Sequence, residues 1–464
     1  MSAHDPGGMK DTEARRLARF VTLADAATIS TQARDELLKR VLDSIGVAIA
    51  ALDGEPIGYL RVHLADFGGT PHCTLIGGGK TAPDRAAFYN GALVRYLDFM
   101  DAYLAKGETC HPSDNLGAVL AAAEYADRSG TDFLSALAVA YQVQSRLSDV
   151  APVRDKGFDH TVQGAYAVAA GVSRALGLDA EQTANAIAIS GTCNNALRVT
   201  RTGALSHWKG LAYPNTAFVG THAAFLAYRG ITGPEEVFEG NKGFRDTIAG
   251  PFEIDWSKED LEIVRKSILK KYNAEIHAQS SIEGALELHA RYGIKAEAID
   301  RIEIDIFDVA FNIIGGGEEG DKTLVRTKEE ADHSLQYMVG VALIDGNVLP
   351  AQYAPDRILR DDIQALLHRF IVRPSGEYTN RFPEEICATI KVILTDGRIV
   401  SIDKTDYEGF RTRPMSWGTV IDKFNGLAAP FASERVRNMI IDAVRNSERT
   451  KVRDFTAILA DLTA

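Results

Sequence analysis

Apolar residues recur at helical spacing along most of the first half of the chain. The segments with this pattern are 12–52, which holds two helices, and 84–104, 113–128, 131–148, 161–177, 179–192 and 214–229. Glycine or aspartate stands at several of their ends, as at Gly130, Gly177 and Asp179. Many of the segments are rich in alanine, and small side chains let helices pack closely. This half of the chain therefore predicts a compact bundle of helices.

The pattern changes near residue 255. Apolar and polar residues then alternate with the period of two that strands have, in segments 301–307, 386–394 and 398–402. Helical spacing returns in segments 277–291, 331–345, 417–426 and 431–446. We therefore expect a mainly α protein with an all-α domain over residues 1–258, a smaller α+β domain over 259–404, and a C-terminal part, 405–464, that rejoins the helical domain.

Composition narrows the class of protein. The chain has 464 residues and a formal net charge of −12, so a nucleic-acid surface is not expected. No uninterrupted apolar run reaches membrane-spanning length. The four cysteines are widely spaced, which favours a reducing compartment and argues against a zinc site or a Cys-ligated iron–sulfur cluster. Residues 1–16 have no apolar centre, so we expect no secretory signal and a cytoplasmic protein.

The first candidate site is the segment 98–115, DFMDAYLAKGETCHPSDN. Asp98 and Asp101 end an expected helix three residues apart, so they should share one helix face. His111 precedes the next helix, where Ser113 can cap the first amide groups. Because a helix start disfavours imidazolium, His111 should stay neutral and able to accept a proton. The segment favours proton transfer on an anionic substrate, and a solvated pair of carboxylates is the plainer alternative.

Two further candidates lie at the starts of helices. His160 precedes the helix expected at 161–177, and Lys209 lies just before the one expected at 214–229. A lysine in such a position can bind a carboxylate as a point charge. A plain structural alternative stays open for each residue: a capping or core histidine, and a surface lysine.

The remaining candidates lie at and beyond the junction of the expected domains. Lys270, Glu275 and His277 belong to the junction segment KKYNAEIH, where charges often face a cleft; a solvated linker is the alternative. His333 and Tyr337, in ADHSLQY, are four residues apart and share a helix face. A packed aromatic pair is the alternative there.

Two glycine-rich segments do not match a cofactor motif. Residues 77–81, GGGKT, are similar to the end of a phosphate-binding loop, but Thr74 stands where that motif requires its first glycine. Residues 315–320, GGGEEG, lack the spacing of a dinucleotide-binding turn. We expect a flexible connection at the first segment and a surface loop at the second.

Taken together, several long segments resemble the MmgE/PrpD family: AAFYNGALVRYLDFMDAYL, HPSDNLGAVLAAAEY, GFDHT, WKGLAYPNTAF, KKYNAEIHAQSSIEGALELH and ADHSLQYMVGVALIDG. The resemblance runs from about residue 35 to about residue 425. It implies a large all-α domain built from both ends of the chain, with an α+β lid inserted between them. It also implies a homodimer that works without an iron–sulfur cluster, so we expect no cofactor and no metal.

The resemblance also implies a site for di- or tricarboxylates, because family members dehydrate 2-methylcitrate or citrate, decarboxylate cis-aconitate, or epimerise iminodisuccinate. The catalytic residues expected from it are Asp98, His111, His160, Lys209, Lys270 and Tyr337. The substrate-binding residues expected with them are Asp101, Ser113, Glu275, His277 and His333. AEIHAQ and HPSDNLG resemble the dehydratase branch. Relatives often carry threonine where Ala102 stands, which leaves the exact substrate open.

The expected reaction is elimination of water from a hydroxy-tricarboxylate. The hydrogen removed is weakly acidic, so Lys209 and Lys270 are expected to stabilise the enediolate that forms. His111 is the candidate base or acid, with Asp98 orienting its ring. The departing hydroxyl is expected to take its proton from another side chain, Tyr337 or His160.

Two alternatives to dehydration stay open. The first is decarboxylation or epimerisation in the same pocket. The second is a helical scaffold without catalytic activity, which predicts that the side chains of His111, Lys209 and Lys270 point into solvent or lie too far apart to contact one small molecule.

Overall fold

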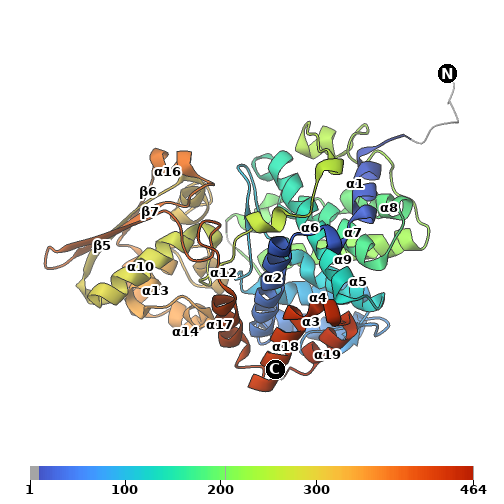
Figure 1. The fold of residues 1–464 in the computed structure, drawn as a ribbon. Coiled ribbons are helices and arrows are strands. Elements are labelled where there is room, and N and C mark those ends of the chain that lie inside the picture. Colours follow the sequence, from blue (N-terminus) through green and yellow to red (C-terminus); the bar gives the residue numbers. More distant parts are fainter. Residues whose placement is uncertain (1–9, 204, 463–464) are drawn as a thin grey trace.

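The computed structural model describes residues 10–203 and 205–462 (Figure 1). We expect no secretory signal in residues 1–16, and residues 1–9 of that segment lie outside the described part of the chain. Helices make up most of the regular structure, which confirms the predicted mainly α class. Among the described residues, no helix combines the length and apolar character that crossing a membrane requires.

Buried hydrophobic side chains form two separate cores. The first runs from Ala14 to Leu269 and resumes from Met415 to Leu462, and the second extends mainly from Ile268 to Phe410. We call residues 10–264 with 415–462 the helical unit and residues 272–410 the sheet unit. Figure 1 shows the two units side by side, with the sheet unit in yellow and orange. The chain crosses between them twice, through residues 265–271 and 411–414.

The helical unit is built from long helices in chain order. They are α1 (Glu13–Leu23), α2 (Thr31–Ala50), α3 (Glu55–Phe67), α4 (Pro83–Tyr96), α5 (Leu116–Tyr125), α6 (Gly130–Val150), α7 (Thr161–Leu176), α8 (Ala180–Cys193) and α9 (Trp208–Tyr228). Ser30, Ser129 and Asp179 start α2, α6 and α8 by accepting hydrogen bonds from amide groups of the first turn. The last helices, α17 (Trp417–Ala428), α18 (Glu434–Arg445) and α19 (Val452–Ala460), add their apolar side chains to the same core.

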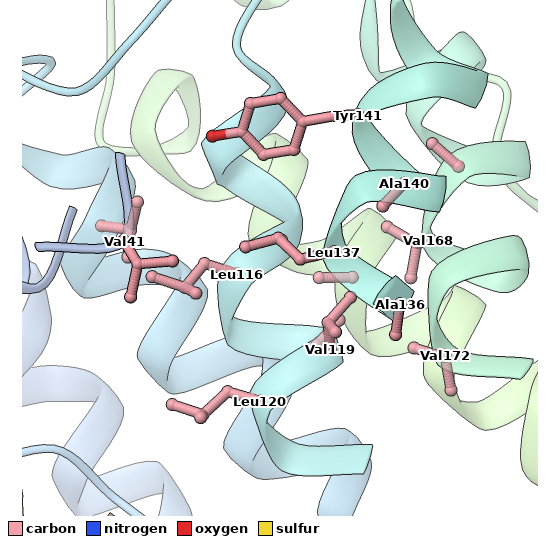
Figure 2. Close-up of a cluster of buried hydrophobic side chains, with 14 of the residues drawn as sticks. Val41, Leu116, Val119, Leu120, Ala136, Leu137, Ala140, Tyr141, Val168 and Val172 are labelled. Carbon is pink, nitrogen blue, oxygen red and sulfur yellow. The ribbon is translucent and has the colours of Figure 1, made fainter. Parts of the chain in front are cut away.

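Small side chains bring α5, α6 and α7 close together (Figure 2). Val119 of α5 lies beside Ala136 of α6 and Val172 of α7, and Ala140 of α6 lies beside Val168 of α7. A Cβ atom added at Gly171 of α7 would lie 2.9 Å from Ala140 Cβ and 3.0 Å from Val119 Cγ2. An alanine at this glycine would therefore force the helices apart, which is the physical reason for the small residues in this part of the sequence.

The sheet unit holds a four-stranded sheet covered by helices. Its strands are β5 (Ile299–Ile306), β6 (Phe370–Pro374), β7 (Ala388–Leu394) and β8 (Ile399–Lys404), in the order β6-β5-β7-β8. β6 runs parallel to β5, and the other pairs are antiparallel. Helix α10 (Gln279–Tyr292) packs on β7 and β8, and α13 (Leu335–Asp345) packs on α10. Shorter helices complete the unit: α11 (Asp308–Ala310), α12 (Lys328–Ala331), α14 (Pro355–Ile358), α15 (Asp361–Leu367) and α16 (Gly376–Arg381).

Several element boundaries differ from those that the pattern predicts. Helix α4 ends at Tyr96 instead of continuing to residue 104, and α9 begins at Trp208, with Pro214 inside it, instead of at residue 214. The sequence pattern also did not predict α3, α19 or strand β6. The early end of α4 matters most for function, because it changes the direction in which the carboxylates at 98 and 101 point.

Candidate active site

A small, polar cavity of about 50 Å³ lies between the two units. From the helical unit it is lined by Arg95, Asp98, Glu108, Thr109, His111, Arg154, His160, Arg198 and Arg201. From the first crossing and the sheet unit it is lined by Lys270, Glu275, His277, Ile313, Glu319 and His333. Most of the residues predicted from the sequence therefore meet at one place, although they come from segments far apart in the chain.

Asp98 is the centre of a buried ion network. It lies just past the end of α4 with a φ of 54°, a left-handed conformation that is unusual for a residue other than glycine. Its Oδ1 accepts hydrogen bonds from Arg95 Nη1 at 2.5 Å and from Lys270 Nζ at 2.7 Å. Lys270 Nζ also donates to the Asp98 carbonyl at 2.6 Å. Burial alone would raise the pKa of Asp98, but the cations around it hold that pKa well below its usual value.

A second cation, Lys209, lies beside the first network. Its Nζ is 2.6 Å from Asp332 Oδ1, 2.9 Å from His333 Nδ1 and 3.7 Å from Asp98 Oδ2. The possible ligand atoms of Asp98, Asp332 and His333 lie within 4.8 Å of one another, which is close enough to hold a metal ion. The lysine ammonium already occupies the space between them. Burial lowers the pKa of Lys209 to about 8, although Asp332 and Asp98 favour its charged form.

His111 presents a proton acceptor to the cavity. Its Nδ1 lies 2.7 Å from the Asp101 carbonyl oxygen, which can only accept, so Nδ1 carries the hydrogen and Nε2 carries the lone pair. Burial, together with the positive charges of Arg95 and Lys270, lowers the pKa of His111 well below its usual value. From the sequence, the Asp98 carboxylate is expected to orient this ring. The structure shows instead that the backbone carbonyl of Asp101 holds it.

The carboxylate of Asp101 has a different neighbourhood from that of Asp98. It accepts hydrogen bonds from the Ser113 amide at 3.1 Å and from the Tyr141 hydroxyl at 2.8 Å. The prediction that Asp98 and Asp101 share a helix face is wrong, because α4 has already ended at Tyr96. Asp101 instead supports the segment that carries His111, and neither Asp101 nor Ser113 lines the cavity.

Two more histidines are each paired with a carboxylate. His160 Nδ1 lies 3.0 Å from Asp159, which Arg201 also binds at 2.7 Å, and His277 Nδ1 lies 2.7 Å from Glu275. The Nε2 atoms of His160 and His277 are buried and have no hydrogen-bond partner within residues 10–203 and 205–462. Both atoms belong to residues that line the cavity, so they are available to a bound molecule.

The rim of the cavity, which we call the mouth, is formed by Arg154, Arg198 and Glu319. Arg198 Nη2 donates to Glu319 Oε1 at 2.6 Å, and Arg154 Nη2 lies 3.9 Å from the same oxygen. Glu319 belongs to the glycine-rich segment 315–320, for which a surface loop is predicted. That prediction is wrong for this residue, because its side chain is buried against the two arginines.

Tyr337 lies apart from the other predicted residues. Its hydroxyl donates to the Gln352 carbonyl, and its ring packs near Tyr353 inside the sheet unit. It does not line the cavity. Ala102 also lies outside the cavity, buried in the second core and paired with the backbone of Ile268.

Sequence reasoning missed the arginines that line the cavity. They are Arg95, Arg154, Arg198 and Arg201. A usable signal was present, since an acidic chain needs a local group of cations to bind an anionic substrate. Arginines close to the GFDHT and WKGLAYPNTAF segments were the natural candidates for that group.

Two larger cavities, of about 610 Å³ and 1,170 Å³, lie elsewhere on the molecule. Neither is lined by the histidines at 111, 160, 277 or 333. The small cavity therefore remains the candidate active site, because the groups able to move a proton converge on it.

Comparison with known proteins gives matches along most of the chain. The models of the MmgE/PrpD N-terminal domain and the MmgE/PrpD C-terminal domain match residues 15–257 and 272–449. A 2-methylcitrate dehydratase of Cupriavidus necator is 30% identical over 370 residues, 74% of this chain and 74% of that protein. A 2-methylcitrate dehydratase of Salmonella typhimurium is 27% identical over 438 residues, 87% of this chain and 89% of that protein. A fungal alkylcitrate dehydratase is 30% identical over 413 residues, which cover 81% of this chain and 78% of that protein.

Proposed function

The chain belongs to the MmgE/PrpD family, and from that premise we propose that it is a hydro-lyase that removes water from a citrate-type hydroxy-tricarboxylate. The proposed substrate is 2-methylcitrate or citrate, and the product is an aconitate-type alkene. The observation that carries the proposal is the convergence of His111, His160 and Lys270 on one cavity. Lys209 does not line this cavity, but its Nζ contacts two side chains that do, those of Asp98 and His333. A scaffold without catalytic activity predicts the opposite, since it leaves these side chains exposed or scattered.

In the proposed reaction, His111 Nε2 accepts a proton from the carbon next to a carboxylate. The electrons of the broken C–H bond pass through an enediolate, which Lys209 and Lys270 stabilise as its negative charge grows. These electrons then form the C=C bond while the neighbouring C–O bond breaks. His160 gives the departing hydroxyl a proton, and water leaves.

The two histidines must differ in protonation for this reaction. The tautomer of His111, fixed by the Asp101 carbonyl, already leaves Nε2 able to accept a proton. Burial lowers the pKa of His160, while Asp159 beside it favours its charged form. A bound tricarboxylate adds further negative charge and raises the pKa of His160 toward the value that a general acid needs. Tyr337 is a weaker candidate for this role, because its hydroxyl faces Gln352.

We propose that the reaction needs no metal ion. The ammonium group of Lys209 supplies positive charge where Asp98, Asp332 and His333 converge. Removal of divalent metal ions with a chelator is therefore expected to leave the activity unchanged.

We also propose a cytoplasmic homodimer. Helix α3 carries exposed apolar side chains that a partner subunit could cover: Tyr59, Val62 and Phe67, which are 60%, 67% and 61% exposed. Light scattering of the purified protein is expected to give twice the mass of the chain, and the mass of one chain would reject the dimer.

The proposed function is tested by ultraviolet absorbance with 2-methylcitrate and, separately, with citrate, in the presence of a chelator. The conjugated alkene product absorbs, whereas the substrates do not. We expect a steady rise for the wild type, and a rate about 10²–10⁴-fold lower for His111→Gln. His222→Gln, which changes an exposed histidine of α9, is the matched control and should keep the wild-type rate.

A flat trace with both substrates would reject dehydration. The protein would then be tested for decarboxylation of cis-aconitate by release of carbon dioxide, and for epimerisation by loss of optical activity without a change in absorbance. A rate that falls with the chelator and returns with a divalent ion would reject the metal-independent reaction alone.

A further inference from the structure

We propose that Arg154 and Arg198 form a subsite for one carboxylate of the substrate. In the absence of substrate the side-chain carboxylate of Glu319 occupies this subsite, and the substrate displaces it. The proposal rests on the tricarboxylate chemistry proposed above and adds a specific binding contact to it. It also gives a role to the glycine-rich segment 315–320, which the proposed reaction does not use.

The arginines that line the cavity fall into two groups. Arg95 and Arg201 are neutralised by carboxylates of their own unit, Asp98 and Asp159, at 2.5 Å and 2.7 Å. Within the described residues, the carboxylate that lies within ion-pair distance of Arg154 and Arg198 is that of Glu319, and it comes from the other unit. When Glu319 withdraws, two guanidinium groups are left facing the cavity. Paired guanidinium groups bind a carboxylate with well-defined geometry.

Glu319 is held from one side only. Its Oε1 takes the hydrogen bond from Arg198, while its Oε2 is buried and has no hydrogen-bond partner in the described chain. A buried carboxylate oxygen without a partner is unfavourable, because it has lost water and gained nothing in exchange. A substrate carboxylate that satisfies both arginines has an advantage over Glu319 at this position.

The size of the cavity requires that something move before a substrate binds. Its volume of about 50 Å³ is far below the 300–1,000 Å³ that small-molecule sites commonly have. Glu319 is carried by the sheet unit, whereas Arg154 and Arg198 belong to the helical unit. Separation of the units therefore enlarges the cavity and frees the arginines in the same movement.

The test measures binding of tricarballylate by calorimetry. This tricarboxylate has no hydroxyl group, so it cannot be dehydrated, and its binding is independent of turnover. We expect Glu319→Gln to bind it about tenfold more tightly than the wild type, because the internal competitor has lost its charge. Arg198→Gln is expected to bind about 10–100-fold more weakly, since a charge-assisted contact is lost.

The matched control is Glu318→Gln, which removes the same charge from the neighbouring, exposed position of the same loop. It should bind tricarballylate within twofold of the wild type. In the double variant Arg198→Gln with Glu319→Gln, the gain from Glu319→Gln should disappear, because the residue no longer competes for an intact subsite. If Arg198→Gln does not fold by circular dichroism, Arg154→Gln takes its place, with a smaller expected loss of about threefold.

Three results would overturn the proposal. Glu319→Gln could bind tricarballylate more weakly than the wild type or equally well, which would mean that Glu319 only links the two units and does not compete with the substrate. Glu318→Gln could match Glu319→Gln, which would make the effect one of general charge. The wild type could fail to bind tricarballylate at all. The absorbance assay measures turnover and does not depend on these binding results. Dehydration can therefore be rejected while the subsite is confirmed, and the subsite can be rejected while dehydration is confirmed.

Discussion

The inner wall and the mouth of the cavity hold their cations in different ways. We call Asp98, Lys270 and His333, together with Lys209 and Asp332 that contact them, the inner wall. There the Lys270 side chain is 0% exposed and is fixed directly on Asp98. At the mouth, Arg154 and Arg198 are 16% and 17% exposed and meet a carboxylate from the opposite unit. The inner wall keeps its positive charge in place before a substrate arrives, as stabilisation of a developing charge requires. At the mouth, the charges of Arg154 and Arg198 are balanced by Glu319, which a substrate carboxylate can replace.

The largest effect is expected from removing a charge at the inner wall. Lys270→Met keeps the length of the side chain but leaves the buried Asp98 carboxylate without one of its cations. We expect a loss of about 3–5 kcal/mol in the free energy of unfolding and a fall of about a thousandfold in kcat/KM. Urea denaturation and the absorbance assay measure the two quantities.

Lys271→Met is the control for this variant, because Lys271 is the next residue and pairs with Glu408 near the surface. It should change the free energy of unfolding by less than about 1 kcal/mol. Equal effects of the two variants would contradict the difference between the inner wall and the surface.

The pH dependence of catalysis tests Lys209. Because burial lowers the pKa of Lys209 to about 8, the side chain is charged below that pH and neutral above it. If its charge is needed, kcat/KM falls about tenfold for each pH unit above 8. Lys209→Arg keeps a positive charge at every accessible pH, so its profile should lack this decline even if its maximum is lower. A decline at the same pH in both proteins would assign it to another group.

One carboxylate behind the inner wall is not fixed by a hydrogen bond. Asp114 lies 3.8 Å from Arg95 Nε, and both of its oxygens lack a hydrogen-bond partner in the described residues. Burial raises the pKa of Asp114 to about 7, against an ordinary value near 4. Between these two pH values the folded protein holds a proton that the unfolded chain has released, so the free energy of unfolding falls as the pH rises.

Asp114→Asn removes this dependence, because an amide does not ionise. Relative to the wild type, the variant should gain about 1–3 kcal/mol in the free energy of unfolding between pH 5 and pH 8. Denaturant titrations of both proteins at the two pH values measure this gain. A difference that stays constant across the range would show that Asp114 is already ionised at pH 5.

The smallest effect is expected at the mouth. Arg154→Ala removes a partly exposed guanidinium group that lies 3.9 Å from Glu319. We expect a loss of less than about 1 kcal/mol in the free energy of unfolding. Thermal denaturation measures it, and a loss as large as that of Lys270→Met would remove the distinction between the two ends of the cavity.

The sequence predicted the helical unit best, for a physical reason. Its helices carry their signals locally, in alanine-rich periodic segments with caps such as Ser30 and Asp179. Strand β6 has no such signal, because it is a short, mostly exposed edge strand that pairs with β5, about 70 residues earlier.

The details of the site depend on contacts between distant segments. The left-handed conformation of Asp98 accompanies its bond to Lys270, 172 residues away. Glu319 is buried by Arg198, 121 residues away, although its glycine-rich surroundings predict a surface loop. Local patterns cannot contain such information. The resemblance to a family supplied the candidate residues, and the structure supplied their partners.

We propose that the two units together remove water from a citrate-type substrate. Proton NMR of 2-methylcitrate incubated with the wild-type protein and a chelator tests it most directly. We expect an alkene. It is seen as a methyl singlet if the carbon bearing the methyl group loses its proton, or as a vinyl proton if the other neighbouring carbon does. An unchanged spectrum with both 2-methylcitrate and citrate would contradict the proposed dehydration.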